Sequence, residues 1–174
     1  MEPSVLGTKY DKLAQWWHEQ HHDSLYGVKQ VEKAVSFCSG GGRALDIGCG
    51  AGGRFIRILE DNNFFVTGLD VSKEMIKLAR KNHPEQQFIY QDICIWETDQ
   101  TFDFILAWDS IFHLPFNMQI PVLTKLCKLL TKRGILIYTF GDAYGEHTDQ
   151  MCNDTFYYSS IGINENIQLL MDKG

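Results

Sequence analysis

The chain has 174 residues, of which 44% are hydrophobic and 22% charged, and its formal net charge is −6. This length suits one hydrophobic core, so we expect a single domain over residues 1–174. The negative charge argues against nucleic acid as the main partner, because polyanion binding depends on clustered Lys and Arg.

The cysteines and the N-terminus predict the compartment. The five cysteines form no C-x-x-C pair, and their odd number does not suggest a disulfide framework. The N-terminal residues lack a basic start and an apolar stretch of signal length. No later segment approaches the roughly 20 apolar residues that span a bilayer. We therefore expect a cytoplasmic protein that does not enter the membrane.

Two helical patterns, over residues 9–21 and 28–38, precede the first expected strand. They are not needed to complete a sheet, so residues 1–42 are candidates for a helical cap over a ligand. The alternative is simple core packing by Leu13, Trp16 and Trp17. The sequence favours neither interpretation.

From residue 43 to residue 174, strand and helix patterns alternate and predict one α/β core. The expected strands span residues 43–47, 64–69, 87–90, 102–107 and 135–140. The expected helices span residues 54–62, 73–82, 118–130 and 164–173, the last followed by Gly174 as a typical C-cap. The first should bury Phe55, Ile58 and Leu59. The second should have Ser72 as its N-cap and bury Met75, Ile76 and Ala79. This alternation predicts βαβ units and a parallel sheet covered by helices on both faces. Ligands of such sheets bind at the carboxyl ends of the strands.

A glycine-rich run, Gly48-Cys49-Gly50-Ala51-Gly52-Gly53, follows the first expected strand. Glycine adopts positive φ and lets a ligand approach main-chain N–H groups, and the next helix directs its partially positive end to the same place. The run satisfies G-x-G-x-x-G, and Asp70 ends the next strand where an acid would meet a ribose hydroxyl. A dinucleotide such as NAD(P) therefore remains possible.

Three features favour a different nucleotide. Asp46 lies in the strand end directly before the glycines, where a carboxylate would repel a pyrophosphate but attract a cationic ligand. The spacing Gly48-x-Gly50-x-Gly52 fits the run equally well. Asp92 follows the third strand, at the position of a polar contact to a purine edge.

From about Thr8 to Gly174 the chain resembles the class I S-adenosylmethionine-dependent methyltransferases. The resemblance rests on Asp46 to Gly52, Leu69-Asp70-Val71-Ser72 with Met75, Gln91-Asp92-Ile93, Phe102 to Asp109 and Gly134 to Ile137. It implies a Rossmann-like fold, S-adenosyl-L-methionine as cofactor and S-adenosyl-L-homocysteine as product.

The resemblance also implies which residues hold each part of the cofactor. The methionine end would lie against Asp46, Gly48, Gly50 and the backbone of Trp108. The ribose hydroxyls would bind to Asp70 through charge-assisted hydrogen bonds. The adenine ring would lie between Val71 and Met75, with its polar edge at Asp92 and the N–H of Ile93.

The acceptor side is expected immediately beyond the fourth strand. His113 has a pKa range suited to a general base, although it could instead contact the cofactor or cap a helix. Asp109 could hold a cationic or hydroxylic acceptor. Six aromatic residues are candidates to line a pocket for a flat or cationic small molecule: Tyr10, Trp16, Trp17, Phe112, Tyr157 and Tyr158.

No metal site is expected. His18, His21 and His22 share a helical face, but an exposed polar face near a helix end accounts for them better than a metal pair. The sequence also lacks the paired acids plus Asn of a metal-dependent catechol-type site.

The chain departs from the family at its C-terminus, where strands six and seven would follow a helix like 164–173. We expect these two strands to be absent, which leaves the fifth strand as an open apolar edge. Either this edge pairs with another chain in a homo-oligomer, or the chain is a shortened form of a longer protein.

Three functions are compatible with these patterns. The first is a methyltransferase that acts on a small-molecule acceptor. The second is a non-catalytic module that binds S-adenosylmethionine or a partner. The third is an NAD(P) oxidoreductase, which would need a catalytic Tyr-Lys or similar pair that the sequence does not reveal.

Overall fold

A computed structural model describes residues 1–173, and the expected Gly174 cap lies outside them. The centre is a five-stranded sheet in the order β3-β2-β1-β4-β5, in which all neighbours pair in parallel. Its strands are β1 (Gly42–Ile47), β2 (Phe64–Asp70), β3 (Gln87–Tyr90), β4 (Phe102–Ala107) and β5 (Leu130–Tyr138). The parallel α/β sheet expected from the alternating pattern is confirmed, as is the Rossmann-like fold that the resemblance implies.

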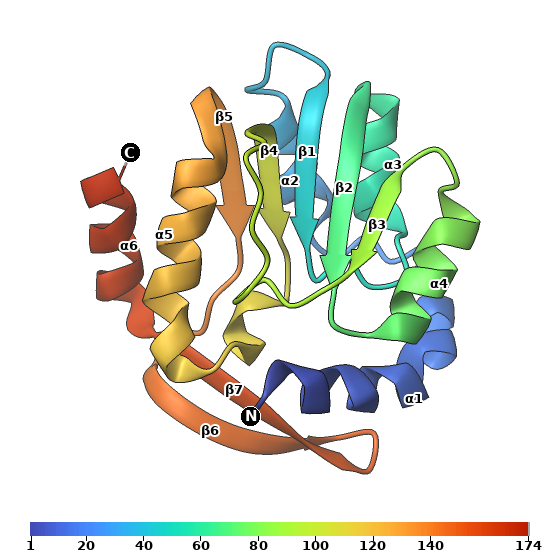
Figure 1. Ribbon diagram of the computed structural model, residues 1–174, viewed down its shortest axis with the longest axis vertical. Coiled ribbons are helices and arrows are strands. Elements are labelled where there is room, and N and C mark those ends of the chain that lie inside the picture. The colour runs from blue at the N-terminus through green and yellow to red at the C-terminus, as the bar shows by residue number, and fades with distance from the viewer. Residues whose placement is uncertain (174) are drawn as a thin grey trace.

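Helices cover both faces of this sheet (Figure 1). One face carries α2 (Val28–Val35), α3 (Arg54–Asp61) and α4 (Lys73–Asn82). The other face carries α5 (Gln119–Leu129) and α6 (Gly162–Lys173). Each layer buries its own apolar cluster against the sheet, so the strands have apolar side chains on both faces.

The start of α4 follows the predicted local pattern. The Ser72 hydroxyl caps the helix by accepting a hydrogen bond from the backbone N–H of Met75 at 3.2 Å. Met75, Ile76 and Ala79 are buried, as expected. In α3 the buried residues are Ile56 and Leu59.

The expected burial of Phe55 and Ile58 in α3 is wrong, since both are only half-buried. The Phe55 ring packs against Trp108, with 5.4 Å between the ring centroids, and both Phe55 and Ile58 pack at the margin of the core cluster.

The N-terminal helix α1 (Pro3–His21) lies across the carboxyl ends of the strands and contacts α4 (Figure 1). A Cβ atom at Gly7 would lie 1.9 Å from the carbonyl oxygen of Val71, so only glycine permits this approach. Asp11 accepts hydrogen bonds from the Ser72 hydroxyl at 2.6 Å and the Glu74 N–H at 3.0 Å. By contrast, α2 packs against the sheet and contributes to the core.

An antiparallel hairpin that the sequence analysis missed lies between β5 and α6. Its strands are β6 (Tyr144–Met151) and β7 (Asp154–Ile161). The pattern was missed because β6 is polar and almost wholly exposed, so no alternation marks it. Cys152 and Asn153 form the turn with positive φ values of 51° and 62°, as in a type I′ turn. The hairpin runs beneath the sheet beside α1, to which the Lys9–Asp154 ion pair joins it (Figure 1).

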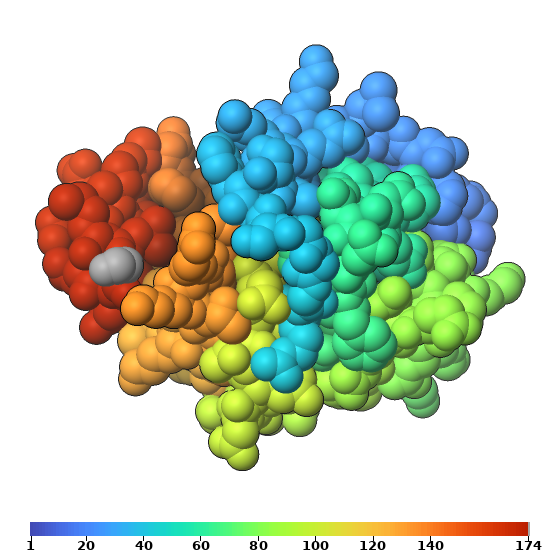
Figure 2. Space-filling model, turned by 90° about the horizontal axis from the view of Figure 1, so that it is seen from above, coloured from blue at the N-terminus to red at the C-terminus, as the bar shows by residue number. Residues whose placement is uncertain are grey.

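Within residues 1–173, β5 pairs only with β4 and forms one edge of the central sheet. The expectation that no sixth and seventh strands extend this sheet is therefore confirmed for the described residues. Figure 2, which views the molecule from above, shows α6 (red) at the end of the molecule next to the β5 region (orange). None of the helices between residues 1 and 173 has the length and hydropathy that a membrane crossing requires.

Candidate functional site

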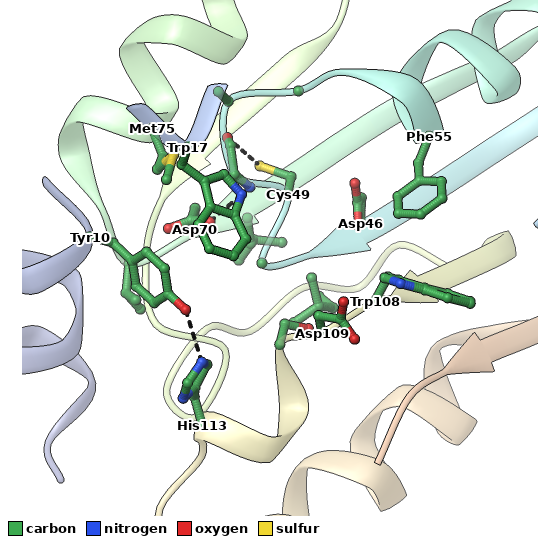
Figure 3. Close-up of a pocket in the computed structure, with 18 of the residues that line it drawn as sticks. Tyr10, Trp17, Asp46, Cys49, Phe55, Asp70, Met75, Trp108, Asp109 and His113 are labelled. Atoms are coloured by element: carbon green, nitrogen blue, oxygen red, sulfur yellow. Dashed lines mark hydrogen bonds between the residues drawn. The ribbon is translucent and has the colours of Figure 1, made fainter. Parts of the chain in front are cut away.

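One pocket opens at the carboxyl ends of β1, β2 and β4, beneath α1 (Figure 3). All eleven residues that the sequence analysis assigned to cofactor binding or catalysis line it. They are Asp46, Gly48, Gly50, Asp70, Val71, Met75, Asp92, Ile93, Trp108, Asp109 and His113. The parallel sheet brings them together because each follows, or ends, a strand at the same edge.

The loop after β1 depends on glycine. Gly48, Gly50 and Gly52 have φ values of 71°, 56° and 74°, which residues with a Cβ rarely adopt. A Cβ at Gly48 would lie 2.4 Å from the Cβ of Ser110, so side-chain bulk is excluded there as well. The loop therefore presents bare backbone to the pocket.

Asp70, the last residue of β2, fixes both neighbouring turns. Its Oδ2 accepts a hydrogen bond from the Gly50 N–H at 2.9 Å, and its Oδ1 accepts one from the Ser72 N–H at 2.8 Å. Burial raises the pKa of this carboxyl group to about 6, against the lowering effect of those two hydrogen bonds. Carboxylate oxygens have further lone pairs, so Asp70 can still accept hydrogen bonds from a ligand.

Asp46 lies at the floor of the pocket, near the end of β1, and is 4% exposed. Burial, with a smaller contribution from Asp70, raises the pKa of its carboxyl group to about 7. A cationic ligand beside it would favour the ionised form. Asp46 is therefore suited to a positively charged group and poorly suited to a phosphate.

The β2–α4 side of the pocket is apolar. Met75 is 2% exposed and packs with Ala14 and Ala51. Val71 and Ile93 also line this part. Asp92 accepts a hydrogen bond from the Cys94 N–H at 2.8 Å, which orders the turn after β3. This side can take a flat apolar ring whose polar edge faces the β3 turn.

Trp108 and Asp109 directly follow β4 and line the side of the pocket opposite the β2–α4 side. The Trp108 ring packs so closely on Gly27 that a Cβ there would lie 2.5 Å from it. Asp109 is a non-glycine residue with a φ of 50°. Its Oδ1 accepts from the Thr139 hydroxyl at 3.2 Å, which in turn accepts from the Asp109 N–H at 2.8 Å. Burial raises the pKa of Asp109 despite this bond.

His113 is buried and both of its ring nitrogens have partners. Nδ1 lies 2.8 Å from the carbonyl oxygen of Tyr157, and Nε2 lies 2.9 Å from the Tyr10 hydroxyl (Figure 3). A carbonyl oxygen only accepts, so Nδ1 carries the proton. Burial lowers the pKa of His113 and raises that of Tyr10, so both groups are neutral. Nε2 then accepts the hydroxyl proton of Tyr10.

A family model described as a methyltransferase domain matches residues 39–173. The chain belongs to the S-adenosylmethionine-dependent methyltransferase family. This match covers the whole sheet and every site residue from Asp46 to His113.

Curated relatives of this methyltransferase family member include a ubiquinone biosynthesis O-methyltransferase from Coxiella burnetii, 34% identical over 139 residues. That alignment covers 72% of this chain and 56% of the relative. The chain thus spans just over half the length of this relative. A phosphoethanolamine N-methyltransferase from Caenorhabditis elegans is 28% identical over 113 residues, covering 61% of this chain and 25% of the relative.

Solved structures show the same fold at low identity. A DhpI complex with SAM and HEP has a TM-score of 0.72 and 18% identity, over 97% of this chain and 86% of that one. The [4+2]-cyclase SpnF has a TM-score of 0.73 and 18% identity, over 99% and 72% of the two chains. A Burkholderia thailandensis 1,6-didemethyltoxoflavin-N1-methyltransferase has a TM-score of 0.73 and 16% identity, over 99% and 79%.

The expected aromatic lining of the methyltransferase pocket is only partly correct. Tyr10 and Trp17 line it, but Phe112, Tyr157 and Tyr158 do not, and Trp16 is 44% exposed on α1. The three excluded residues pack on or near the hairpin, behind His113. Their position depends on a hairpin that the sequence pattern did not reveal.

His18 and His21 lie in the last turns of α1, and His22 directly follows the helix. Among residues 1–173, no group of three or more His, Cys, Asp or Glu side chains could hold a metal ion. His21 stacks on Trp17, with 4.0 Å between ring centroids, and Arg57 contacts His22.

Two functional candidates escaped the sequence analysis. Arg54 lines the pocket while donating to the carbonyl oxygen of Tyr26 at 2.8 Å, so it joins α3 to the turn after α1. His83 contacts the glycine loop from behind. A lone Arg or His has no sequence pattern, and only their neighbours in the fold reveal them.

Proposed function

We propose that the chain binds S-adenosyl-L-methionine in this pocket and transfers its methyl group to a small-molecule acceptor. The observation that supports this most directly is the joint placement of Asp46, the bare glycine loop and Asp70 around one pocket. Their order matches the cofactor's own order of a cationic amino acid end, a ribose and an adenine. We expect S-adenosyl-L-homocysteine as the product.

The donor groups of the pocket fit this cofactor. Asp46 would bind the ammonium group, with Gly48, Gly50 and the backbone of Trp108 along the methionine chain. Asp70 would accept the ribose hydroxyls without releasing Gly50 or Ser72. Val71 and Met75 would hold the adenine faces, and Asp92 with the Ile93 N–H would meet its polar edge. The relatives named as methyltransferases support a methyl donor as the ligand of this pocket.

The cofactor supplies an electrophilic methyl group, so the protein mainly aligns the acceptor and excludes water. For an acceptor that loses a proton, Tyr10 and His113 form a proton relay. The acceptor proton moves to the Tyr10 oxygen while the Tyr10 proton moves to Nε2 of His113. The Nδ1 proton stays on Nδ1 throughout, where it is donated to the Tyr157 carbonyl oxygen. Asp109, which lines the same pocket, would orient the acceptor.

We also propose that the chain works in a reducing compartment such as the cytoplasm, because all five cysteines are free. The negative net charge of −6 supports a small-molecule partner over nucleic acid. The unpaired edge of β5 supports self-association into a homo-oligomer.

Calorimetry with S-adenosylmethionine, S-adenosylhomocysteine and NAD tests the cofactor assignment. We expect the first two to bind and NAD not to bind, because Asp46 opposes a pyrophosphate at the glycine loop. Binding of NAD alone would overturn the proposal. Incubation of a metabolite extract with isotope-labelled cofactor, followed by mass spectrometry, then separates methyl transfer from binding without catalysis.

A further inference from the structure

The glycine loop is hydrogen-bonded to Asn82, the last residue of α4, and to His83, which directly follows the helix. We propose that His83 is a positioning residue which, with Asn82, holds the glycine loop in the shape that receives the cofactor. This inference rests on the proposed function, since it assigns a role in preparing the same site.

Three backbone groups of the loop make these hydrogen bonds, and all three partners belong to the segment from the end of β2 to the residue that directly follows α4. Gly50 donates its N–H to Asp70 at 2.9 Å, at the end of β2. The Ala51 carbonyl oxygen accepts from Nδ2 of Asn82 at 2.9 Å. Gly53 directs its N–H towards Nε2 of His83, with 3.3 Å between the two nitrogens. The loop is therefore held at its start, middle and end.

The loop needs such contacts because its own residues do not specify a conformation. Gly52 and Gly53 have φ values of 74° and 123°, and glycine has the largest backbone freedom to lose. A loop left free would have to be ordered when the ligand binds, at the expense of affinity. Contacts present before binding remove that cost.

The surroundings of His83 fix which nitrogen accepts. Glu60 on α3 places Oε2 2.8 Å from Nδ1, and a carboxylate only accepts, so Nδ1 carries the proton. Nε2 is then unprotonated, and its lone pair can accept the hydrogen bond from the Gly53 N–H. Glu60 thus orients the imidazole, and His83 in turn orients the loop.

The ring also makes direct steric contact with the loop. His83 is 6% exposed, and a Cβ at Gly52 would lie 2.6 Å from its Cδ2 atom. A residue that only filled this space could be replaced by an apolar side chain of similar size. A residue that positions the loop must keep an acceptor where Nε2 lies.

Two substitutions separate these roles. His83→Leu keeps most of the volume and removes the acceptor, whereas His83→Gln can place Oε1 near the position of Nε2. In the ligand-free protein, we expect amide hydrogen exchange at Gly53 to be about tenfold faster in His83→Leu and close to the parent rate in His83→Gln. We expect the Kd for S-adenosylhomocysteine to rise about tenfold in His83→Leu and to be restored largely in His83→Gln.

Val122→Ala is the control, because Val122 is fully buried on α5 in the opposite cluster. It should lower thermal stability without changing exchange at Gly53 or the Kd. If His83→Leu does not fold, Asn82→Ala is the substitute variant. It removes the half-buried hydrogen bond to the Ala51 carbonyl oxygen, and it should raise the Kd for S-adenosylhomocysteine.

Unchanged exchange and affinity in His83→Leu would overturn the assignment, as would an equal loss of affinity in Val122→Ala. Should the parent fail to bind S-adenosylhomocysteine, the proposed function would fall. Exchange at Gly53 in the ligand-free protein would still decide whether His83 holds the loop.

Discussion

Asp70 joins three parts of the pocket through a single carboxylate. It holds the glycine loop at Gly50 and the start of α4 at Ser72, and it lines the cavity between them. Removing it therefore affects both the shape of the pocket and its charge.

We expect Asp70→Ala to weaken binding of S-adenosylhomocysteine by about 1.5–3 kcal/mol, the usual range for hydrogen bonds to a charged group. Calorimetry measures this directly. Asp99→Ala, which removes an exposed acid outside the pocket, should leave the affinity unchanged. An affinity for Asp70→Ala within about twofold of the parent would show that the binding mode is wrong.

Affinity for the cofactor should depend on pH through Asp46. Its pKa of about 7 lies above the ordinary carboxyl value, so the ligand-free protein is protonated there below neutral pH. The ammonium group binds the ionised form, so affinity should rise with pH through about 7 and then level off. Calorimetry across this range measures the slope.

Asp46→Asn is the matched test of that slope. It should bind more weakly at high pH and lose the dependence near neutrality, leaving only the change near pH 6 that Asp70 contributes. A slope that persists unchanged in Asp46→Asn would assign the titration to another group.

His113 should exist as the Nδ1–H tautomer at neutral pH. Its Nδ1 faces the Tyr157 carbonyl oxygen and its Nε2 faces the Tyr10 hydroxyl. Long-range ¹H–¹⁵N NMR spectra distinguish this tautomer from the Nε2–H form. A protonated Nε2 would contradict the proposed relay.

Tyr10→Phe provides a second measurement of the same pair. It leaves the buried Nε2 without a partner, so we expect a loss of about 1–3 kcal/mol in the free energy of unfolding. The affinity for S-adenosylhomocysteine should stay near the parent value, because Tyr10 is assigned to the acceptor side. A large loss of cofactor affinity would show that Tyr10 contacts the cofactor and not the acceptor.

At the scale of elements, α1 is docked through two specific contacts. Gly7 lies directly on the Val71 carbonyl group, and Asp11 caps the start of α4 together with Ser72. A methyl group at Gly7 should stabilise the protein by helix propensity but destabilise it by its clash with the Val71 carbonyl group. The sign of the stability change therefore tests how α1 is docked.

We expect Gly7→Ala to lower the free energy of unfolding by about 1–3 kcal/mol, the usual effect of overpacking. Propensity alone would stabilise the helix by roughly 0.8–1 kcal/mol. Urea unfolding gives the sign. Thr8→Ala, an exposed neighbour on the same helix, should have a small effect. A more stable Gly7→Ala variant would show that α1 is not docked as described.

The hairpin is the element that local sequence did not predict. Strand β6 faces solvent with polar side chains, so it lacks the apolar alternation that identifies strands. It is held by its partner β7, whose Phe156 is fully buried against Tyr10. Pairing to β7 and packing on α1 therefore specify this element.

At the scale of the whole molecule, the edge of β5 is the unpaired part of the central sheet within residues 1–173. Thr139 directs its N–H to the Ala107 carbonyl oxygen of β4. Because strand residues alternate, the backbone groups of Leu136 and Tyr138 face the open edge. These groups are available to a strand of a second copy.

Sedimentation velocity over a range of concentrations should reveal a dimer. Leu136→Pro removes an edge N–H without removing a bond to β4, so it should reduce dimerisation while the chain remains folded. Ile167→Ala, on the exposed face of α6, is the control. A parent that stays monomeric at all concentrations would contradict the proposed oligomer.

The sequence by itself determined the sheet and the group of residues that meet at its carboxyl edge. Short segments rich in apolar and aromatic residues located β3 and β4 at their observed bounds, because such side chains favour strands. Asp46, Asp70 and Asp92 were identified because each lies at a strand end, and parallel strands bring those ends to one edge.

Tertiary structure alone decided the contacts between distant segments. Tyr10 and His113 are 103 residues apart, and no periodicity relates them. The same holds for Asp11 at the start of α4 and for His83 behind the glycine loop. Local sequence encodes repeating structure, whereas a single polar contact across the fold is specified only when packing brings its two partners together.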